Sequence, residues 1–188
     1  IEQYIRDAKI DSLYEGTTGV QSQDFFFRKI VRDNGRAIGH VNDEIQVYLD
    51  SHDSAHSKGA RSGNGRLKEE RALLATALGD LQAMLGTMIG YLTSAQEDPH
   101  NTYKVAQHTV RFLDSAGDVL IGWLLLRQAD VALAALSGEP SERDRAFYEG
   151  KVGAASFFAK TVLPELTARR AIVESADNAL MDLSEDAF

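Results

Sequence analysis

The stretch Leu67–Gln96, LKEERALLATALGDLQAMLGTMIGYLTSAQ, decides the fold class of this 188-residue chain. Its apolar residues recur three and four positions apart, which places them on one face of an α-helix. Glu69 and Glu70 stand in the first turn, where the helix dipole favours negative charge. We therefore predict a long core helix whose buried face consists of Leu73, Leu74, Ala77, Leu81, Met84, Leu85, Met88, Ile89 and Leu92.

Two further stretches with the same spacing follow this helix. The first runs from Tyr103 to Leu136 as one helix, after a break at 98–101 in which Asn101 or Thr102 is expected to be the N-cap. The second begins at Ser141 and contains Pro164, which should kink it. These patterns predict three long antiparallel helices packed as a bundle.

The N-terminal residues predict shorter helices, one or more of which pack against this bundle. Residues 1–10 fit the last turns of an amphipathic helix, and with no starting methionine the chain looks like a piece of a longer protein. A second helix is expected from Thr18 to a stop at Gly35, and a third over 37–50. Phe25–Phe27 should cover most of the second helix, so at least one ring is expected to meet a surface other than the core; a helix buried on several sides is the favoured interpretation.

The chain divides into two parts around a polar segment. Residues 51–65 are rich in serine and glycine and predict an exposed linker between residues 1–50 and a complete helical unit at 66–188. No alternating strand pattern occurs in the sequence. We predict an all-α fold in which the end of one helical domain is followed by an up-down helical bundle.

Composition excludes several classes of function. The chain has no cysteine, which rules out disulfides and thiolate metal sites, and we expect it to be cytoplasmic. A net charge of -8 without a basic patch argues against nucleic acid as a partner. The longest strongly apolar run, Val119–Leu126, is far short of the ~20 residues that cross a bilayer, so no membrane span is expected.

Two histidines and several large apolar residues are weak candidates for a site. His52 and His56 have the spacing of two zinc ligands on one helix face, but no third ligand follows, and a solvated linker is the favoured interpretation. Trp123, Met84 and Met88 are expected in the core. None of these residues predicts a catalytic or metal centre.

The turn Tyr14-Glu15-Gly16-Thr17-Thr18-Gly19 is the strongest candidate. Glycine lets the backbone bend around the carboxylate, and the threonine hydroxyls can cap the next helix or contact a ligand. Glu15 is therefore either a general base or a solvated residue at a helix junction in which Thr17 or Thr18 is the N-cap. The residue types alone leave both interpretations open.

The residues around this turn resemble a known enzyme family. Arg6-Asp7-Ala8-Lys9-Ile10, then Leu13-Tyr14-Glu15-Gly16-Thr17, then Val20-Gln21 are similar to the C-terminal helical domain of flavin-dependent acyl-CoA dehydrogenases. The rest of the chain more loosely resembles the extra C-terminal domain of a longer subgroup, which includes methylmercaptopropionyl-CoA dehydrogenases. That part of the likeness rests on 147–151, Phe157-Phe158 and Leu163-Pro164.

The resemblance implies a site and its chemistry. Glu15 matches the family's catalytic base, which removes the α-proton of an acyl-CoA while a hydride passes to FAD. Gly16 matches the position beside the substrate thioester, and Thr17, Thr18 and Gly19 match the FAD-contacting segment. Electron-transfer flavoprotein as acceptor and a homodimer or homotetramer are also implied. An acyl-CoA oxidase and a non-catalytic helical oligomerisation module remain as alternatives.

Overall fold

The computed structural model describes residues 1–11, 17–53 and 65–187, and this part of the chain contains helices and no strand. The all-α prediction is therefore confirmed for the described residues. The elements are α1 (Glu2–Ala8), α3 (Thr18–Gln23), the π-helix η1 (Asp24–Val31), α4 (Arg36–Asp53), α5 (Lys68–Ser94), α6 (Asn101–Ala106), α7 (Thr109–Leu136), α8 (Glu142–Thr161), α9 (Glu165–Glu174) and the 3₁₀ turn η3 (Glu185–Ala187).

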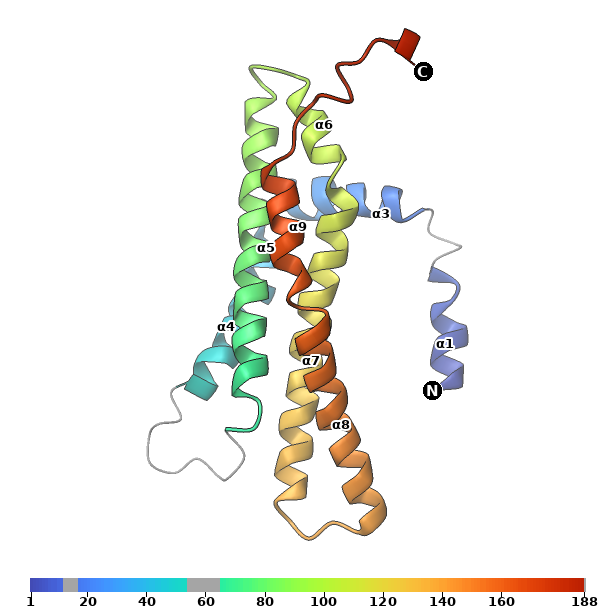
Figure 1. Ribbon diagram of the computed structural model, residues 1–188, viewed down its shortest axis with the longest axis vertical. Helices are drawn as coiled ribbons and strands as arrows, with labels where there is room; N and C mark the ends of the chain where they lie inside the picture. Colours follow the sequence, from blue (N-terminus) through green and yellow to red (C-terminus); the bar gives the residue numbers. More distant parts are fainter. Residues whose placement is uncertain (12–16, 54–64, 188) are drawn as a thin grey trace.

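The long helices form the predicted bundle. Helix α5 runs up the long axis of the molecule, α7 returns down it, and α8 and α9 run up again (Figure 1). The most extensive contact is between α7 and α8, and α5 packs against both α9 and α7. Helices α3 and α4 and the π-helix η1 join this bundle through α5 and α7, as the sequence predicts.

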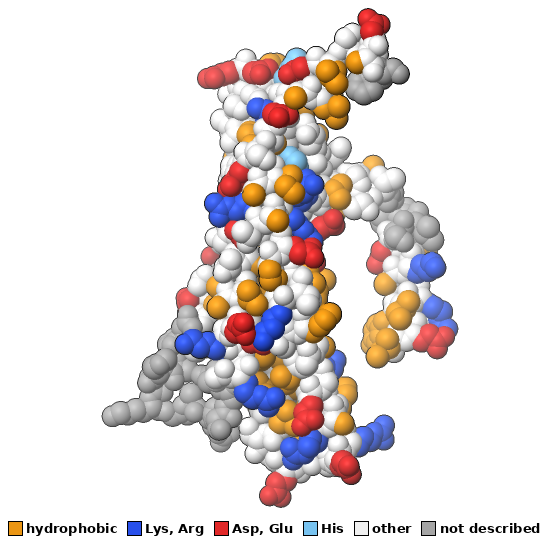
Figure 2. Space-filling view, viewed as in Figure 1, with side chains coloured by type: hydrophobic (Ala, Val, Ile, Leu, Met, Phe, Trp, Pro, Cys, Tyr) orange, Lys and Arg blue, Asp and Glu red, His pale blue; other side chains and the backbone are white. Residues whose placement is uncertain are grey.

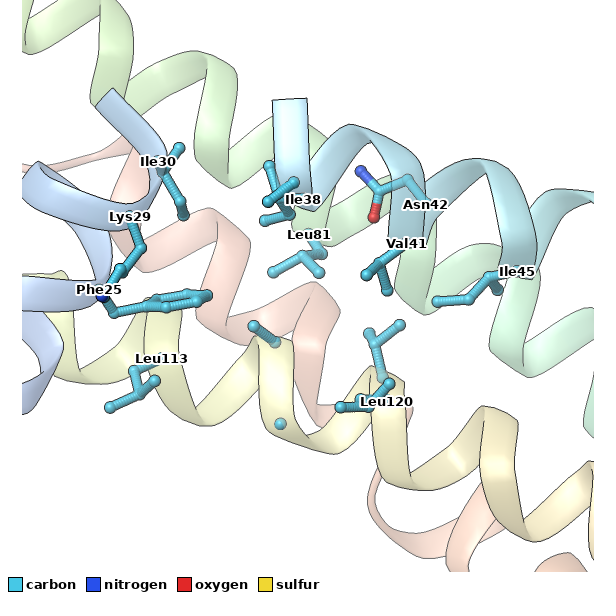
Figure 3. A pocket seen from close by; sticks show the side chains of 14 residues that line it. Phe25, Lys29, Ile30, Ile38, Val41, Asn42, Ile45, Leu81, Leu113 and Leu120 are labelled. Atoms are coloured by element: carbon cyan, nitrogen blue, oxygen red, sulfur yellow. The ribbon is translucent and has the colours of Figure 1, made fainter. Parts of the chain in front are cut away.

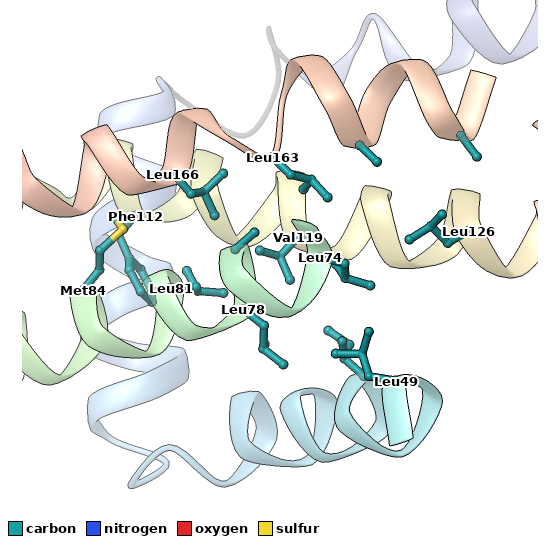
Figure 4. Packing of buried hydrophobic residues seen from close by; sticks show 14 of the residues in the cluster. Leu49, Leu74, Leu78, Leu81, Met84, Phe112, Val119, Leu126, Leu163 and Leu166 are labelled. Carbon is teal, nitrogen blue, oxygen red and sulfur yellow. The ribbon is translucent and has the colours of Figure 1, made fainter. Parts of the chain in front are cut away.

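The core of the bundle is drawn from all the long helices. Its side chains interdigitate between α5, α7 and the α8–α9 segment (Figure 4). Met84 and Met88 are fully buried in it, which confirms their predicted place. Each large side chain buried in this way contributes roughly 1.5–3 kcal/mol relative to an exposed one. The labelled members are Leu49, Leu74, Leu78, Leu81, Met84, Phe112, Val119, Leu126, Leu163 and Leu166.

The beginning and the bend of the last long segment follow local sequence signals. Ser141 is the N-cap of α8, where its hydroxyl accepts a hydrogen bond from the Asp144 amide. Helix α8 ends before Pro164, and α9 begins directly after it, so the predicted kink is confirmed. At this bend a Cβ on Gly122 would lie 3.1 Å from a methyl of Leu163, so glycine lets α7 approach the bend closely.

The stretch predicted as one helix from Tyr103 to Leu136 is broken, which corrects the prediction. Backbone angles of φ -117° and ψ 1° take His108 out of the α-helix and separate α6 from α7. The His108 amide bonds to the Val105 carbonyl, and the Thr109 hydroxyl bonds to the Ala106 carbonyl, so local polar groups replace the α-helical pattern here. No proline or glycine marks this break in the sequence.

The predicted cap of α6 is also wrong. His100 is the N-cap and makes no side-chain cap bond, while Asn101 is already the first helical residue. The amides of Asn101 and Thr102 bond to the Asp98 and Pro99 carbonyls, so the turn at Pro99 satisfies the groups that a side-chain cap would otherwise serve.

Helix α5 carries charged residues into the bundle, where each has partners. Asp80 accepts hydrogen bonds from the Thr167 hydroxyl, at 2.6 Å, and from Arg170, at 3.3 Å. Glu70 accepts from Ser156 and pairs with Lys160. Burial alone would raise the pKa of Glu70, but these hydrogen bonds and the Lys160 charge lower it overall. These two carboxylates therefore hold α5 to α8 and α9.

Two helical segments of the described residues are long and apolar enough by composition to cross a membrane. They are α5 and the range Asn101–Leu136, which contains α6, the break at His108 and α7. This is weak evidence for a span, because the core helices of a bundle pass the same test, and both segments contribute buried residues to the core cluster. The run Val119–Leu126 is too short to cross a bilayer by itself, whereas the mean hydropathy over a longer part of each segment is high enough for a span.

Candidate functional site

The structure describes only part of the predicted site. Glu15 and Gly16, together with Tyr14, lie outside the described residues. Thr17, Thr18 and Gly19 are described, and they form the beginning of α3. Residues 54–64 of the predicted linker also lie outside the described part, and the division into 1–50 and 66–188 stays a prediction.

Thr17 is the N-cap of α3, and it is one of the two residues predicted for that position. Its backbone is extended, at φ -72° and ψ 158°, and its hydroxyl accepts from the Val20 amide at 3.4 Å. Its carbonyl accepts from the Gln21 amide. Thr18 is exposed, and the amides of Thr18 and Gly19 are among the first-turn groups that have no partner within a helix. The helix start therefore offers hydrogen-bond donors to a polar ligand group.

A buried hydroxyl pair fixes α3 on the bundle. Ser22 Oγ lies 3.0 Å from Thr109 Oγ1 of α7 and 2.8 Å from the Gly19 carbonyl oxygen. Both Ser22 and Thr109 are buried, so neither hydroxyl exchanges these bonds for water. The break before α7 places the Thr109 hydroxyl at this point. The orientation of the predicted site residues on α3 thus depends on the junction between α6 and α7.

Three consecutive phenylalanines reinforce this contact. Phe25 stacks on Phe112 of α7 at 6.0 Å between ring centroids, and Phe26 meets Phe112 edge-on at 6.1 Å. Phe26 and Phe27 are themselves edge to face at 5.1 Å. All three rings contact the core cluster, so the expectation that one must turn to another surface is wrong.

The π-helix explains that correction. The Arg32 amide bonds to the Phe27 carbonyl and the Gly35 amide to the Ile30 carbonyl, both five residues back. This wider turn changes the directions of successive side chains from those of an α-helix, on which the expectation was based. Gly35 has φ +71°, the left-handed conformation that its predicted role as a stop requires.

A buried histidine, His108, directly precedes Thr109 of the hydroxyl pair in the sequence. His108 Nδ1 accepts from Arg111 Nη1 at 2.7 Å, and His108 Nε2 has no partner among the described residues. Burial, and then the Arg111 charge, lower the pKa of His108 below its usual value. The ring is therefore neutral near pH 7, with its proton on Nε2. Its buried place between α6 and α7 supports a structural role at this junction.

A polar cluster at the C-terminal end of α4 was not predicted. Asp130 of α7 accepts a hydrogen bond from the Tyr48 hydroxyl at 2.7 Å, pairs with Arg71 of α5, and lies 3.2 Å from His52 Nε2. Burial, followed by the bond to Asp130, raises the pKa of Tyr48, so the phenol stays protonated. The cluster joins three helices through one carboxylate. Each partner lies more than 50 residues from Asp130 in the sequence, which leaves no local signal.

The zinc pattern is not supported by the described residues. His52 contacts Asp130, while His56 lies outside the described part of the chain. No group of three metal-ligating side chains occurs among the residues that the structure describes. The histidine at position 52 contributes to the attachment of α4 instead.

An apolar pocket between the N-terminal helices and the bundle was also not predicted. It has a volume of about 330 Å³ and is walled by η1, α4, α5 and α7 (Figure 3). Sequence periodicity assigns its lining residues to helix faces, but the space lies between four elements, whose relative placement periodicity does not determine.

Comparison with known proteins identifies relatives of this chain. The family described as "Acetyl-CoA dehydrogenase C-terminal like" matches residues 38–184. The chain is 60% identical over its full 188 residues to the broad-specificity linear acyl-CoA dehydrogenase FadE5 of Mycobacterium tuberculosis, of which it covers 29%. It is 31% identical over 187 residues to the 3-methylmercaptopropionyl-CoA dehydrogenase of Ruegeria pomeroyi, covering 28% of it.

A more distant relative gives the same assignment. A butyryl-CoA dehydrogenase of Syntrophomonas wolfei is 28% identical over 194 aligned positions, and the chain again covers 29% of it. The chain spans less than a third of the length of these curated relatives. The family match covers most of the sequence and agrees with the helical fold. This chain therefore belongs to the acyl-CoA dehydrogenase family, and it corresponds to the C-terminal part of its relatives.

Proposed function

We propose that this chain is the C-terminal part of an FAD-dependent acyl-CoA dehydrogenase that oxidises acyl-CoA thioesters to 2,3-enoyl-CoA. The observation that carries the proposal is the 60% identity to an acyl-CoA dehydrogenase over the whole chain, a range that includes the turn at 14–19. The cytoplasm is the proposed location, and fatty acyl oxidation the proposed context.

Glu15 is the proposed catalytic base. Its carboxylate removes the α-proton of the thioester, while FAD, when bound, accepts the hydride from the β-carbon. A carboxylate beside Tyr14 and an apolar substrate is desolvated, and desolvation raises a carboxyl pKa towards the pH at which a general base is most effective. Gly16 leaves room for the thioester to pass close to the backbone.

Thr17, Thr18 and Gly19 are the proposed cofactor-contacting residues. The residues fit this role, because Thr18 is exposed and the first-turn amides of α3 can donate to a polar cofactor group. A Cβ at Gly19 would lie 3.6 Å from Thr17 Oγ1, an ordinary contact, so the fold itself does not demand glycine here. A glycine here would also let a ligand approach the backbone closely.

The decisive experiment is a base substitution in the full-length protein. We expect Glu15→Gln to lower turnover by about 10²- to 10⁴-fold across a panel of acyl-CoA thioesters, with the bound flavin spectrum retained. Glu2→Gln, an exposed carboxylate on α1, is the matched control. Wild-type turnover in Glu15→Gln would disprove the assignment of the base. The isolated 188-residue chain is expected to purify without yellow colour, because its relatives are more than three times as long.

The electron acceptor distinguishes the proposal from its enzymatic rival. Electron-transfer flavoprotein is the proposed acceptor, whereas an acyl-CoA oxidase passes the electrons to oxygen. Oxygen consumption by the full-length protein without another acceptor would identify the oxidase. Both enzymes require the same base, so the Glu15→Gln result does not depend on this choice.

A second candidate is a non-catalytic oligomerisation module. The observation that favours it is a row of exposed apolar side chains on α7, namely Leu120, Leu124 and Val131. Size-exclusion chromatography of residues 66–188 tests it, and a strict monomer would count against it. A homodimer or homotetramer is also proposed for the dehydrogenase, so assembly alone does not exclude the enzyme.

A further inference from the structure

The pocket beside η1 has the shape and lining of a binding site for an aliphatic chain. Its volume of about 330 Å³ lies within the range of small-molecule sites. Its floor consists of core residues that are almost completely buried, Ile30, Ile45, Leu81 and Val119. The side chains converge on a shared space between α4 and α7 (Figure 3). An apolar ligand would therefore lie against the hydrophobic core of the bundle.

The polar groups of the pocket are confined to two residues. Of its 14 lining residues, only Lys29 ionises and only Asn42 carries an uncharged polar side chain. Lys29 runs past Phe25 at one end of the space, and Asn42 lies at α4 (Figure 3). The lining is thus apolar except for the Asn42 amide on α4 and the positive charge of Lys29 at one end.

The charge at that end is available to an anion. Arg28, the neighbouring cation, is paired with Asp24 at 2.7 Å, whereas Lys29 forms no ion pair with any described residue. The chain carries a net charge of -8, so most of its surface repels an anionic ligand and a local cation is needed to hold one. Lys29 supplies that cation at the end of an apolar pocket.

We propose that this pocket binds one straight-chain fatty acid, with its aliphatic tail between α4 and α7 and its carboxylate at Lys29. A long-chain alcohol lacks the charge that Lys29 attracts, and a two-tailed phospholipid exceeds the single apolar space. The proposed site is built from residues 25–45 and two bundle helices, and it does not include Glu15 or the start of α3. It therefore holds independently of the proposed enzymatic function.

Gly117 makes the proposal testable with little disturbance of the fold. It lines the pocket, and no neighbouring atom lies within 4 Å of the position that its Cβ would occupy. Leucine at this position would project into the space for the ligand and would also be a better helix former than glycine. Gly79 on α5 is equally open but does not line the pocket, so Gly79→Leu is the matched control.

The experiment is calorimetric titration of the full-length protein with dodecanoate, with the proposed active site saturated by an acyl-CoA. We expect one dodecanoate site in the wild type and in Gly79→Leu, and at least tenfold weaker binding in Gly117→Leu. Val41→Trp closes the pocket from α4 and should have the same effect, which guards against misfolding of one variant. Lys29→Gln should weaken dodecanoate about two- to fivefold, as expected for an exposed ion pair, and leave dodecanol unchanged.

Three results would overturn the proposal. Equal dodecanoate affinity in Gly117→Leu and wild type would place the ligand elsewhere. Dodecanol bound as tightly as dodecanoate, with no effect of Lys29→Gln, would remove the role of the carboxylate. No dodecanoate binding by the wild-type protein would mean that another segment of the longer protein, or a second copy of it, fills the pocket.

Discussion

Helices α1 and α3 lie on either side of residues 12–16, yet they differ completely in how they are held. Helix α3 is attached through the buried Ser22–Thr109 pair and continues into the phenylalanine cluster. Helix α1 has no buried residue, and Ile1, Tyr4 and Ile5 are 96%, 79% and 65% exposed. Its apolar side chains gather on one side and its charges on the other (Figure 2).

The difference shows what the bundle does for the proposed site. Helix α1 is amphipathic, but no described residue covers its apolar face, whereas α3 contributes to a core drawn from every long helix. The bundle therefore orients the residues after position 16, and α1 requires a surface that these residues do not provide. The predictions below test this asymmetry, beginning with the largest effect.

Removing the Phe112 ring, against which Phe25 and Phe26 pack, should make α3 as weakly attached as α1. Phe112→Ala leaves a cavity beneath Phe25 and Phe26 and should lower the free energy of unfolding by about 3–5 kcal/mol. Urea denaturation measures this change. Limited trypsin digestion should show faster cleavage after Arg28, approaching the rate after Arg6 on α1. Phe157→Ala, at a largely exposed ring, should stay within about 0.5 kcal/mol of wild type, and an equal loss in both variants would contradict this account.

The carboxylate cluster at the far end of α4 should affect stability without affecting α3. Asp130→Ala removes the shared partner of Tyr48, Arg71 and His52 and should cost about 2 kcal/mol, less than a fully buried pair because Asp130 is partly exposed. Denaturation measures the loss, and trypsin cleavage after Arg28 reports on η1. Unchanged cleavage is expected. Cleavage as fast as in Phe112→Ala would show that α3 and α4 open as one unit.

The hydroxyl pair should account for a smaller, specific part of the attachment. Ser22→Ala and Thr109→Val should each cost about 1 kcal/mol. Because the two hydroxyls are partners, the double variant should cost less than the sum of the single ones. A double-mutant cycle from urea denaturation measures the coupling. Strict additivity would show that the 3.0 Å contact does not hold α3 to α7.

Acid should destabilise the junction between α6 and α7 at His108, and this is the smallest of the four expected effects. The folded protein has a lowered His108 pKa, so the unfolded chain binds the proton more readily. Stability is therefore retained above the unfolded pKa, near 6.5, and falls as the pH drops below it. His108→Gln should reduce this fall between pH 7 and 5.5, measured by denaturation at each pH. His100→Gln, at an exposed histidine, is the control, and equal slopes in the two variants would exclude His108.

The elements that the sequence predicts correctly are those with local signals. Ser141, Pro164, Gly35 and Thr17 each act on their own helix end, and the structure places all four as expected. The break at His108 depends on hydroxyl and ring contacts in three dimensions and escaped prediction. The partners of Asp80 and Asp130 are distant in sequence, so no periodicity reveals them.

The candidate site likewise contains features that local sequence signals reveal and features that depend on distant parts of the chain. The cap of α3 is readable from Thr17 because a side chain and the next amides are adjacent. The role of Glu15 rests on resemblance, since the turn alone is compatible with a solvated carboxylate. The pocket depends on how η1, α4, α5 and α7 lie relative to one another, which the sequence pattern does not reveal.

The π-helix at Asp24–Val31 also sets a limit on how this protein can vary in length. Because its hydrogen bonds reach back five residues, loss of one residue from this segment would favour an ordinary α-helix. Every side chain before the deleted residue would then be rotated about the helix axis relative to the side chains after it. The start of α3 would keep its bonds within the helix but lose its alignment with Phe112 and Thr109. Substitutions in this segment can be absorbed by repacking, whereas a single-residue insertion or deletion changes the direction in which α3 presents the residues that precede it.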